Sequence, residues 1–263
     1  MNSAGTSPAP GRPIVLVHGY GVRGSFWEKL QPQLALRGHR VVAPDLSGDS
    51  PFELADRLEA VARDQAVTAG PVALVGHSLG GILCALVAGR VGPAVVSHVV
   101  VIASPFAGRA KGVGPVVKFL IRYRLLPPAL IRPRFFSRAT SRSDQKRWFA
   151  RAVPESPALQ QVLFGTDWFP TAELSRKLLQ PALAVYSEAD RIVEAAATRR
   201  LAAALGAEEH AFPRVRGIGH NDFAASDAVS AAVAGAICDF VSMPAVASGP
   251  WPTEPKGDRD AMA

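Results

Sequence analysis

A serine hydroxyl within a glycine-framed turn is the first group in this sequence that could do chemistry. Ser78 lies in Gly76-His-Ser-Leu-Gly80, where an apolar run gives way to a helical pattern. In that setting, G-x-S-x-G builds a sharp, strained turn that raises the serine hydroxyl above the end of a strand. An ordinary helix cap and a phosphate-binding loop are the alternatives. The loop is excluded because neither a following Lys-Ser/Thr nor a G-x-G-x-x-G is present. We predict that Ser78 is a nucleophile.

A serine hydroxyl needs an adjacent base to attack at neutral pH. His220 is the best candidate, because it lies in a glycine-rich loop between the last predicted strand and the last predicted helix. His18 is expected to shape its own loop, and the His77 side chain is expected to point away from the hydroxyl. The remaining histidines lie beside strands and are expected at the surface or its boundary: His39, His98 and His210.

The base in turn needs a carboxylate that holds its tautomer and stabilises the imidazolium. Asp190 is the first choice, because it follows an apolar strand in Tyr186-Ser-Glu-Ala-Asp190. Glu188 is the alternative, two residues nearer that strand. Asp222 is too close in sequence to His220 to orient it easily, and Asp45 is expected to form a turn or a cap.

Acyl chemistry also requires hydrogen-bond donors for a developing oxyanion. Leu79 supplies the backbone N–H that follows the nucleophile. The second donor is expected from the loop after the first strand, where Tyr20 lies between Gly19 and Gly21. We predict that the N–H groups of Tyr20 and Leu79 form the oxyanion hole.

These residues must be positioned by strands that alternate with helices. Six short apolar runs are strand candidates: 13–17, 40–43, 72–75, 95–102, 182–186 and 208–212. Most lack strict alternation, which is typical of strands covered on both faces. Val229, Val233, Ile237 and Phe240 form a helical stripe near the end. The pattern predicts an α/β fold with a mainly parallel sheet of about six strands and flanking helices.

The predicted boundaries follow composition. Residues 1–12 and 244–263 are expected to be flexible tails, and residues 13–103 and 181–243 to form the core. Residues 104–180 are too long for a simple crossover and are expected to form a helical cap insertion. With no signal-peptide pattern or long apolar run, the protein is expected in the cytoplasm.

The net charge of +7 has an uneven distribution. Between residues 104 and 151 there are twelve basic residues and one acid, Asp144, so this stretch carries +11 and the remainder about −4. A solvated cap face is the simplest explanation. Lys118, Arg122 and Arg124 could also contact an anionic lipid or an acidic carrier protein. No motif accompanies the charge that would indicate nucleic acid.

Four short motifs, taken in chain order, resemble the α/β-hydrolase superfamily of serine esterases and lipases: His18-Gly19, Gly76-His-Ser-Leu-Gly-Gly81, Asp190-x-Ile-Val193 and Gly219-His220. The order Ser, Asp, His is the one that this family uses. The start at the strand before His18, and the segment after Ile102, look like the compact bacterial lipases. Phe106 departs from that subgroup, which usually has a histidine there.

The resemblance implies a carboxylic ester hydrolase that forms an acyl-enzyme on Ser78, with a small-molecule acyl substrate and an apolar acyl pocket. This chemistry needs no metal and no organic cofactor. A thioesterase or acyltransferase that acts with an acidic carrier is an alternative, as is a non-hydrolytic cyclase or ligand-binding member of the same fold. The sequence leaves the substrate and the oligomeric state open.

Overall fold

The computed structural model describes residues 11–106, 128–165, 170–174 and 178–245. Within these ranges, six strands form one parallel sheet in the order β2-β1-β3-β4-β5-β6. The strands are β1 (Gly11–Val17), β2 (His39–Val42), β3 (Val72–His77), β4 (Val96–Ile102), β5 (Ala182–Ser187) and β6 (Glu208–Phe212). The predicted α/β fold with six strands is confirmed. β1 begins two residues earlier than expected, because Gly11 pairs with His39 of β2.

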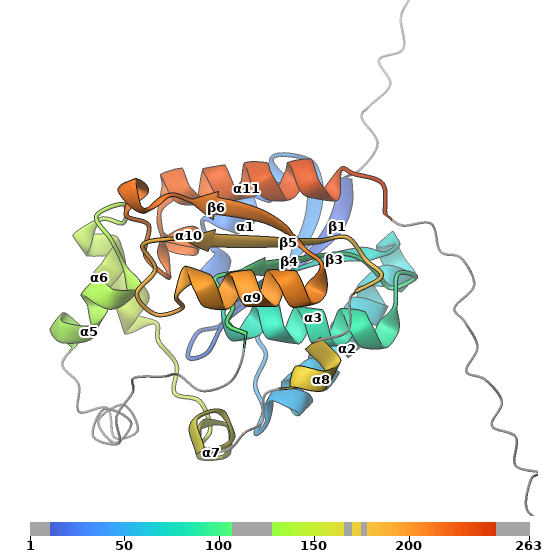
Figure 1. The fold of residues 1–263 in the computed structure, drawn as a ribbon, viewed down its shortest axis with the longest axis horizontal. Coiled ribbons are helices and arrows are strands. Elements are labelled where there is room, and N and C mark those ends of the chain that lie inside the picture. Colours follow the sequence, from blue (N-terminus) through green and yellow to red (C-terminus); the bar gives the residue numbers. More distant parts are fainter. Residues whose placement is uncertain (1–10, 107–127, 166–169, 175–177, 246–263) are drawn as a thin grey trace, which may run out of the picture.

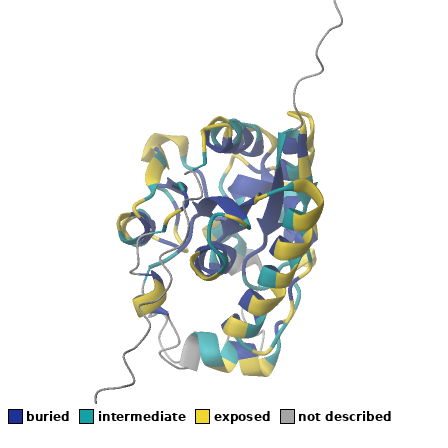
Figure 2. Cartoon of the chain, turned by 90° about the vertical axis from the view of Figure 1, so that its right-hand side faces the viewer, coloured by how far each residue is buried: buried dark blue, intermediate teal, exposed yellow. Residues whose placement is uncertain are grey.

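Helices cover both faces of this sheet (Figure 1). On one face pack α2 (Pro51–Ala69), α3 (Leu79–Val91) and α9 (Ala195–Leu205); on the other pack η1 (Gly24–Trp27), α1 (Leu30–Ala35), α10 (Asp222–Ala225) and α11 (Asp227–Val241). Successive residues of a strand serve opposite faces: Val99 and Val101 contact the first helix layer, and Val100 contacts the second. Figure 2 shows the strands as a buried layer between helices whose outer surfaces are exposed.

Local sequence signals explain where the helices begin and end. Ser50 caps α2, since its hydroxyl accepts a hydrogen bond from the Glu53 N–H at 3.1 Å, and Pro51 fits the first helical position. Gly70 ends this helix with a φ of 82°, a conformation that a side chain disfavours. Another short 3-10 turn, η2 (Arg214–Arg216), follows β6.

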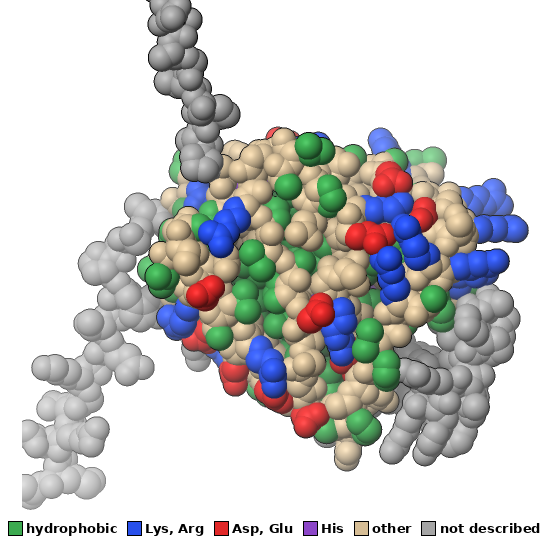
Figure 3. All heavy atoms as spheres, turned by 180° about the vertical axis from the view of Figure 1, so that it is seen from behind, with side chains coloured by type: hydrophobic (Ala, Val, Ile, Leu, Met, Phe, Trp, Pro, Cys, Tyr) green, Lys and Arg blue, Asp and Glu red, His purple; other side chains and the backbone are tan. Residues whose placement is uncertain are grey.

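Among the described residues between β4 and β5 there are four helices, and we call them the insertion helices: α5 (Pro128–Phe135), α6 (Arg142–Ala150), α7 (Pro157–Gly165) and α8 (Thr171–Leu174). In Figure 1, α5 and α6 lie beyond the arrowheads of β5 and β6, at the carboxyl edge of the sheet. Figure 3 shows Lys and Arg side chains projecting at that end of the molecule. Lys118, Arg122 and Arg124, for which contact with an anionic lipid or an acidic carrier protein was the alternative to a solvated cap face, lie outside the described residues.

Two histidines that were expected at the surface or its boundary are buried: His39, at the start of β2, where its Nδ1 lies 2.8 Å from the Arg12 oxygen, and His98. His98 is fully buried on β4, where its ring meets the Phe240 ring edge-on at 5.3 Å between centroids. Burial lowers the pKa of His98 to about 4, and the nearby Arg12 cation contributes. The residue is therefore neutral at pH 7, as its position on a central, doubly covered strand requires.

In the part of the chain that the structure describes, no helix combines the length and the apolar character needed to span a bilayer.

Candidate active site

Ser78 lies at a strained turn between β3 and α3. Its backbone has a φ of 54° and a ψ of −119°, which is unusual for a residue with a side chain. A Cβ added at Gly76 would lie 2.3 Å from the carbonyl carbon of Gly80, so only glycine allows strand and helix to approach so closely. The strained turn that the G-x-S-x-G pattern predicts is therefore present, and it leaves the Ser78 side chain half-buried.

The loop after β1 lies directly against this turn. A Cβ added at Gly19 would lie 3.2 Å from Ser78 Cβ, and one added at Gly80 would lie 2.4 Å from the carbonyl oxygen of Val17. The structure thus brings the segment that carries Tyr20 to the beginning of α3, where Leu79 lies. The assignment of their N–H groups to an oxyanion hole stays a prediction.

His220 and Asp190 form a buried pair at the same edge of the sheet. His220 Nδ1 lies 2.8 Å from Asp190 Oδ2, and the two side chains are only 4% and 1% exposed. The other carboxylate oxygen, Oδ1, accepts hydrogen bonds from the N–H groups of Ile192 and Val193 at 2.8 and 3.0 Å. With both oxygens engaged, Asp190 is held to accept the Nδ1–H, which leaves Nε2 of a neutral His220 free to take a proton.

The other carboxylates that the sequence offered are engaged elsewhere. Glu188 pairs with Arg199 at 3.0 Å and accepts from the Arg214 N–H at 3.2 Å. Asp45 accepts from the Gly24 N–H at 2.7 Å, in the local bonding role expected of it. Asp190 is therefore the carboxylate that the fold brings to His220.

The structure brings Ser78 and His220 into one neighbourhood through His77. His77 immediately precedes Ser78, and its Nε2 lies 2.9 Å from the backbone oxygen of His220, with 4.5 Å between the two ring centroids. Among the described residues, no hydrogen bond joins the Ser78 hydroxyl to His220 itself. The transfer of a proton between them stays a prediction.

His77 has a part in this site that the sequence did not indicate. A carbonyl oxygen only accepts, so His77 Nε2 carries a hydrogen and donates it to His220. Burial lowers the pKa of His77 well below its ordinary value, and the neighbouring His220 lowers it further, so the ring stays neutral. Its stacking against Phe26, at 4.8 Å between centroids, holds the donor in place. His77 thus supports the backbone of the His220 loop, and no sequence signal pointed to that contact.

A second buried carboxylate, Asp222, joins the His220 loop to the insertion. Asp222 is fully buried and accepts hydrogen bonds from the Gly219 N–H at 2.7 Å and from the Thr140 hydroxyl at 2.6 Å. It also accepts from the hydroxyl and the backbone N–H of Ser137. Asn221 N–H donates to the oxygen of Phe135 at 2.8 Å. The loop that presents His220 is therefore held by the segment that follows α5.

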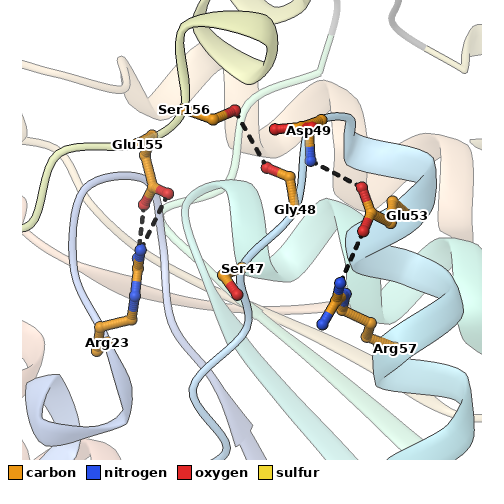
Figure 4. Close-up of a pocket in the computed structure, with 8 residues that line it drawn as sticks. All are labelled: Arg23, Ser47, Gly48, Asp49, Glu53, Arg57, Glu155 and Ser156. Carbon is orange, nitrogen blue, oxygen red and sulfur yellow. Dashed lines mark hydrogen bonds and ion pairs between the residues drawn. The ribbon is translucent and has the colours of Figure 1, made fainter.

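The loop after β1 is also held by the insertion (Figure 4). Glu155 Oε1 accepts from the Gly21 N–H at 2.9 Å and from Arg23 Nη1 at 2.7 Å. The Val153 N–H donates to the Gly21 oxygen at 2.8 Å. A cleft of about 310 Å³ lies here, bordered by Arg23 and Glu155 and by the Glu53–Arg57 pair of α2. Both loops that border Ser78 thus depend on contacts with the 128–165 segment.

Comparison with known proteins identifies the family. Residues 14–235 match the pattern of the Alpha/beta hydrolase family. The chain belongs to the alpha/beta hydrolase family. A pyrethroid hydrolase from Sphingobium wenxiniae is 38% identical over 76 residues, which cover 26% of this chain and 27% of that protein. The magnesium-chelatase 30 kDa subunit of Rhodobacter capsulatus is 36% identical over 85 residues, or 29% of this chain and 30% of that protein. The chain thus matches less than a third of the length of each relative.

Solved structures of this fold are similar over most of their length. A bromoperoxidase from Bacillus anthracis gives a TM-score of 0.73 at 20% identity, covering 89% of this chain and 92% of that one. A lipase-esterase related protein from Clostridium acetobutylicum gives 0.71 at 16% identity, with 89% and 96% covered. A thermophilic esterase from Thermogutta terrifontis gives 0.67 at 20% identity, with 89% and 90% covered. At these identities the likeness concerns the fold.

Proposed function

We propose that this alpha/beta hydrolase cleaves a carboxylic ester through an acyl-enzyme on Ser78. The observation that carries the proposal is the buried hydrogen bond between His220 Nδ1 and Asp190 Oδ2, on loops at the sheet edge where Ser78 lies at its strained turn. A neutral histidine held in this tautomer is suited to general base catalysis next to a hydroxyl nucleophile.

In the proposed reaction, His220 Nε2 takes the Ser78 proton as the hydroxyl oxygen attacks the ester carbonyl carbon. The N–H groups of Tyr20 and Leu79 stabilise the oxyanion of the tetrahedral intermediate. His220 then protonates the leaving alcohol, which departs and leaves an acyl-serine. A water molecule, deprotonated by His220, attacks that ester and releases the acid. The partial similarity to a pyrethroid hydrolase and the fold likeness to an esterase support this reaction class.

A fluorophosphonate probe tests the nucleophile directly. The protein is expected to be labelled on Ser78, and the Ser78→Ala variant is expected to lose both labelling and turnover of p-nitrophenyl esters while it keeps its melting temperature. The Cys84→Ser variant, which changes a buried residue of α3 on the core side, provides a labelling control. Ester hydrolysis that persists in the alanine variant would refute the assignment.

Acyl transfer is the second candidate, because it shares the acyl-enzyme and differs only in the acceptor. Exposed arginines beside the His220 loop favour substrates that carry negative charge, such as thioesters with a phosphorylated leaving group. Rates with ester and thioester donors of one acyl chain, measured with and without an added alcohol, separate the two. A ligand-binding or cyclase role predicts tight binding with no turnover at any chain length.

A further inference from the structure

A second cleft lies beside the loops that carry Asp190 and His220. It has a volume of about 540 Å³, within the range of small-molecule sites. One wall is the end of α5 and the segment after it, and the opposite wall consists of the turn after β5 and the η2 turn after β6. Arg191, next to Asp190, and Gly219, next to His220, both line it. The cleft therefore adjoins the chain neighbours of Asp190 and His220, and neither these two residues nor Ser78 lines it.

Among the described residues, four arginines and no acidic residue line this cleft. Arg134 and Arg138 come from the insertion side, and Arg191 and Arg216 come from the core side. All four are exposed, and none forms an ion pair with any other residue that the structure describes.

The carboxylates nearest to these arginines in sequence do not pair with them. Asp144, the acid nearest to Arg138, pairs with Lys29 and Arg147. Asp190 is buried and bonded to His220, and Asp222 is buried and bonded to Gly219, Ser137 and Thr140. Four like charges around one concave surface repel one another and concentrate a positive potential. A bound anion relieves that repulsion, and the planar guanidinium is the side chain best matched to phosphate oxygens.

We propose that this cleft binds the phosphate of a phosphorylated acyl substrate, whose ester is cleaved at Ser78. The substrate assignment rests on the proposed esterase function, whereas anion binding by the cleft does not. The chemistry required is a phosphate monoester or diester on the leaving group. Such a group occurs both on soluble metabolite esters and on phospholipid headgroups, so the test separates these sources.

The variant that removes one arginine from each wall is Arg138→Gln/Arg216→Gln. The matched control is Arg63→Gln/Arg90→Gln, which loses the same charge from exposed positions on α2 and α3 outside the cleft. The substrates are 1-hexanoylglycerol and its 3-phosphate, which share the scissile ester. The ratio of kcat/KM for the phosphorylated ester to that for the neutral ester is expected to fall about 10- to 100-fold in the cleft variant. An unchanged ratio, or an equal fall in the control, would overturn the proposal.

Binding without turnover separates this inference from the proposed reaction. Calorimetric titration of the Ser78→Ala variant with glycerol 3-phosphate is expected to give saturable binding that the two cleft substitutions weaken at least tenfold. Absence of binding to both glycerol 3-phosphate and phosphatidylglycerol vesicles, or vesicle binding that the two cleft substitutions do not weaken, would refute a phosphate site in the cleft. Binding to the vesicles alone that these substitutions abolish would identify a phospholipid headgroup as the source of the phosphate. If glycerol 3-phosphate binds as expected while Ser78 is not labelled by a fluorophosphonate, the esterase proposal fails and the anion site stands.

Discussion

Two clefts border the insertion helices, one beside the loop after β1 and the other beside the loop that carries His220. Arginines line both. In the first cleft, Arg23 is paired with Glu155 and Arg57 with Glu53 (Figure 4). In the second, the four arginines have no acidic partner among the described residues.

The comparison distinguishes arginines whose charge stabilises the fold, in the first cleft, from arginines whose charge is available to a ligand, in the second. Arg23 is only 18% exposed, and its partner Glu155 also accepts from the Gly21 N–H. The Arg23 charge is therefore neutralised by an ion pair that joins the insertion to the core. The arginines of the second cleft form no ion pair with a described residue, so their charge is available to a ligand that binds from solvent.

The largest expected effect is on kcat of the proposed ester hydrolysis. Asp190→Asn removes the acceptor that holds the His220 tautomer, and is expected to lower kcat by about 10³- to 10⁴-fold. Because this loss concerns proton transfer, it is expected to be equal for neutral and phosphorylated esters. Steady-state kinetics with the two hexanoyl esters measure it. A loss confined to the phosphorylated ester would place Asp190 in substrate binding instead.

Glu155→Ala tests whether the first cleft is structural. It removes the carboxylate partner of the mostly buried Arg23 and the acceptor of the Gly21 N–H, and is expected to cost about 2–4 kcal/mol in free energy of unfolding. Urea denaturation measures the loss, and the Arg23→Ala/Glu155→Ala double variant is expected to recover part of it. If Glu155→Ala is as stable as the parent, the contrast between the clefts fails.

Asp222→Asn tests the hydrogen bonds that join the His220 loop to the insertion, next to the second cleft. The amide nitrogen cannot accept from Ser137, Thr140 or Gly219, so at least one buried donor loses its partner. The expected cost is about 1–3 kcal/mol, with a lower kcat because the His220 loop is less firmly held. A full loss of activity with unchanged stability would instead indicate a direct role in catalysis.

The smallest effect is expected at the exposed pair of the first cleft. Arg57 and Glu53 are 55% and 41% exposed, and solvent screens their interaction. Arg57→Ala is expected to lower Tm by less than about 2 °C and to leave the ratio of the two ester substrates unchanged. A shift of that ratio comparable with the one expected for Arg138→Gln/Arg216→Gln would mean that phosphate binds in the first cleft.

The sequence by itself determined the strands of the sheet, and it predicted Ser78, Asp190 and His220 as site residues on the segments that follow three of these strands. Strands covered on both faces show continuous apolar runs, and the turn at Ser78 requires Gly76 and Gly80 within two residues of it, so both signals are local. The loops with Asp190 and His220 follow strands of one parallel sheet, whose carboxyl ends share an edge. The fold prediction is therefore confirmed, and the two side chains meet at 2.8 Å.

Only the tertiary structure decided which charges are neutralised. Arg23 and Glu155 are separated by 132 residues, and Asp222 bonds to Ser137 across 85 residues. His77 meets the His220 backbone across 143 residues. No periodicity or spacing encodes such pairs, because they arise when the insertion packs on the loops of the core or when two core segments meet. The same residue type is a mostly buried, paired cation at position 23 and, within the described ranges, an exposed cation without an ion pair at position 216. The difference lies in whether folding brings a carboxylate to the arginine.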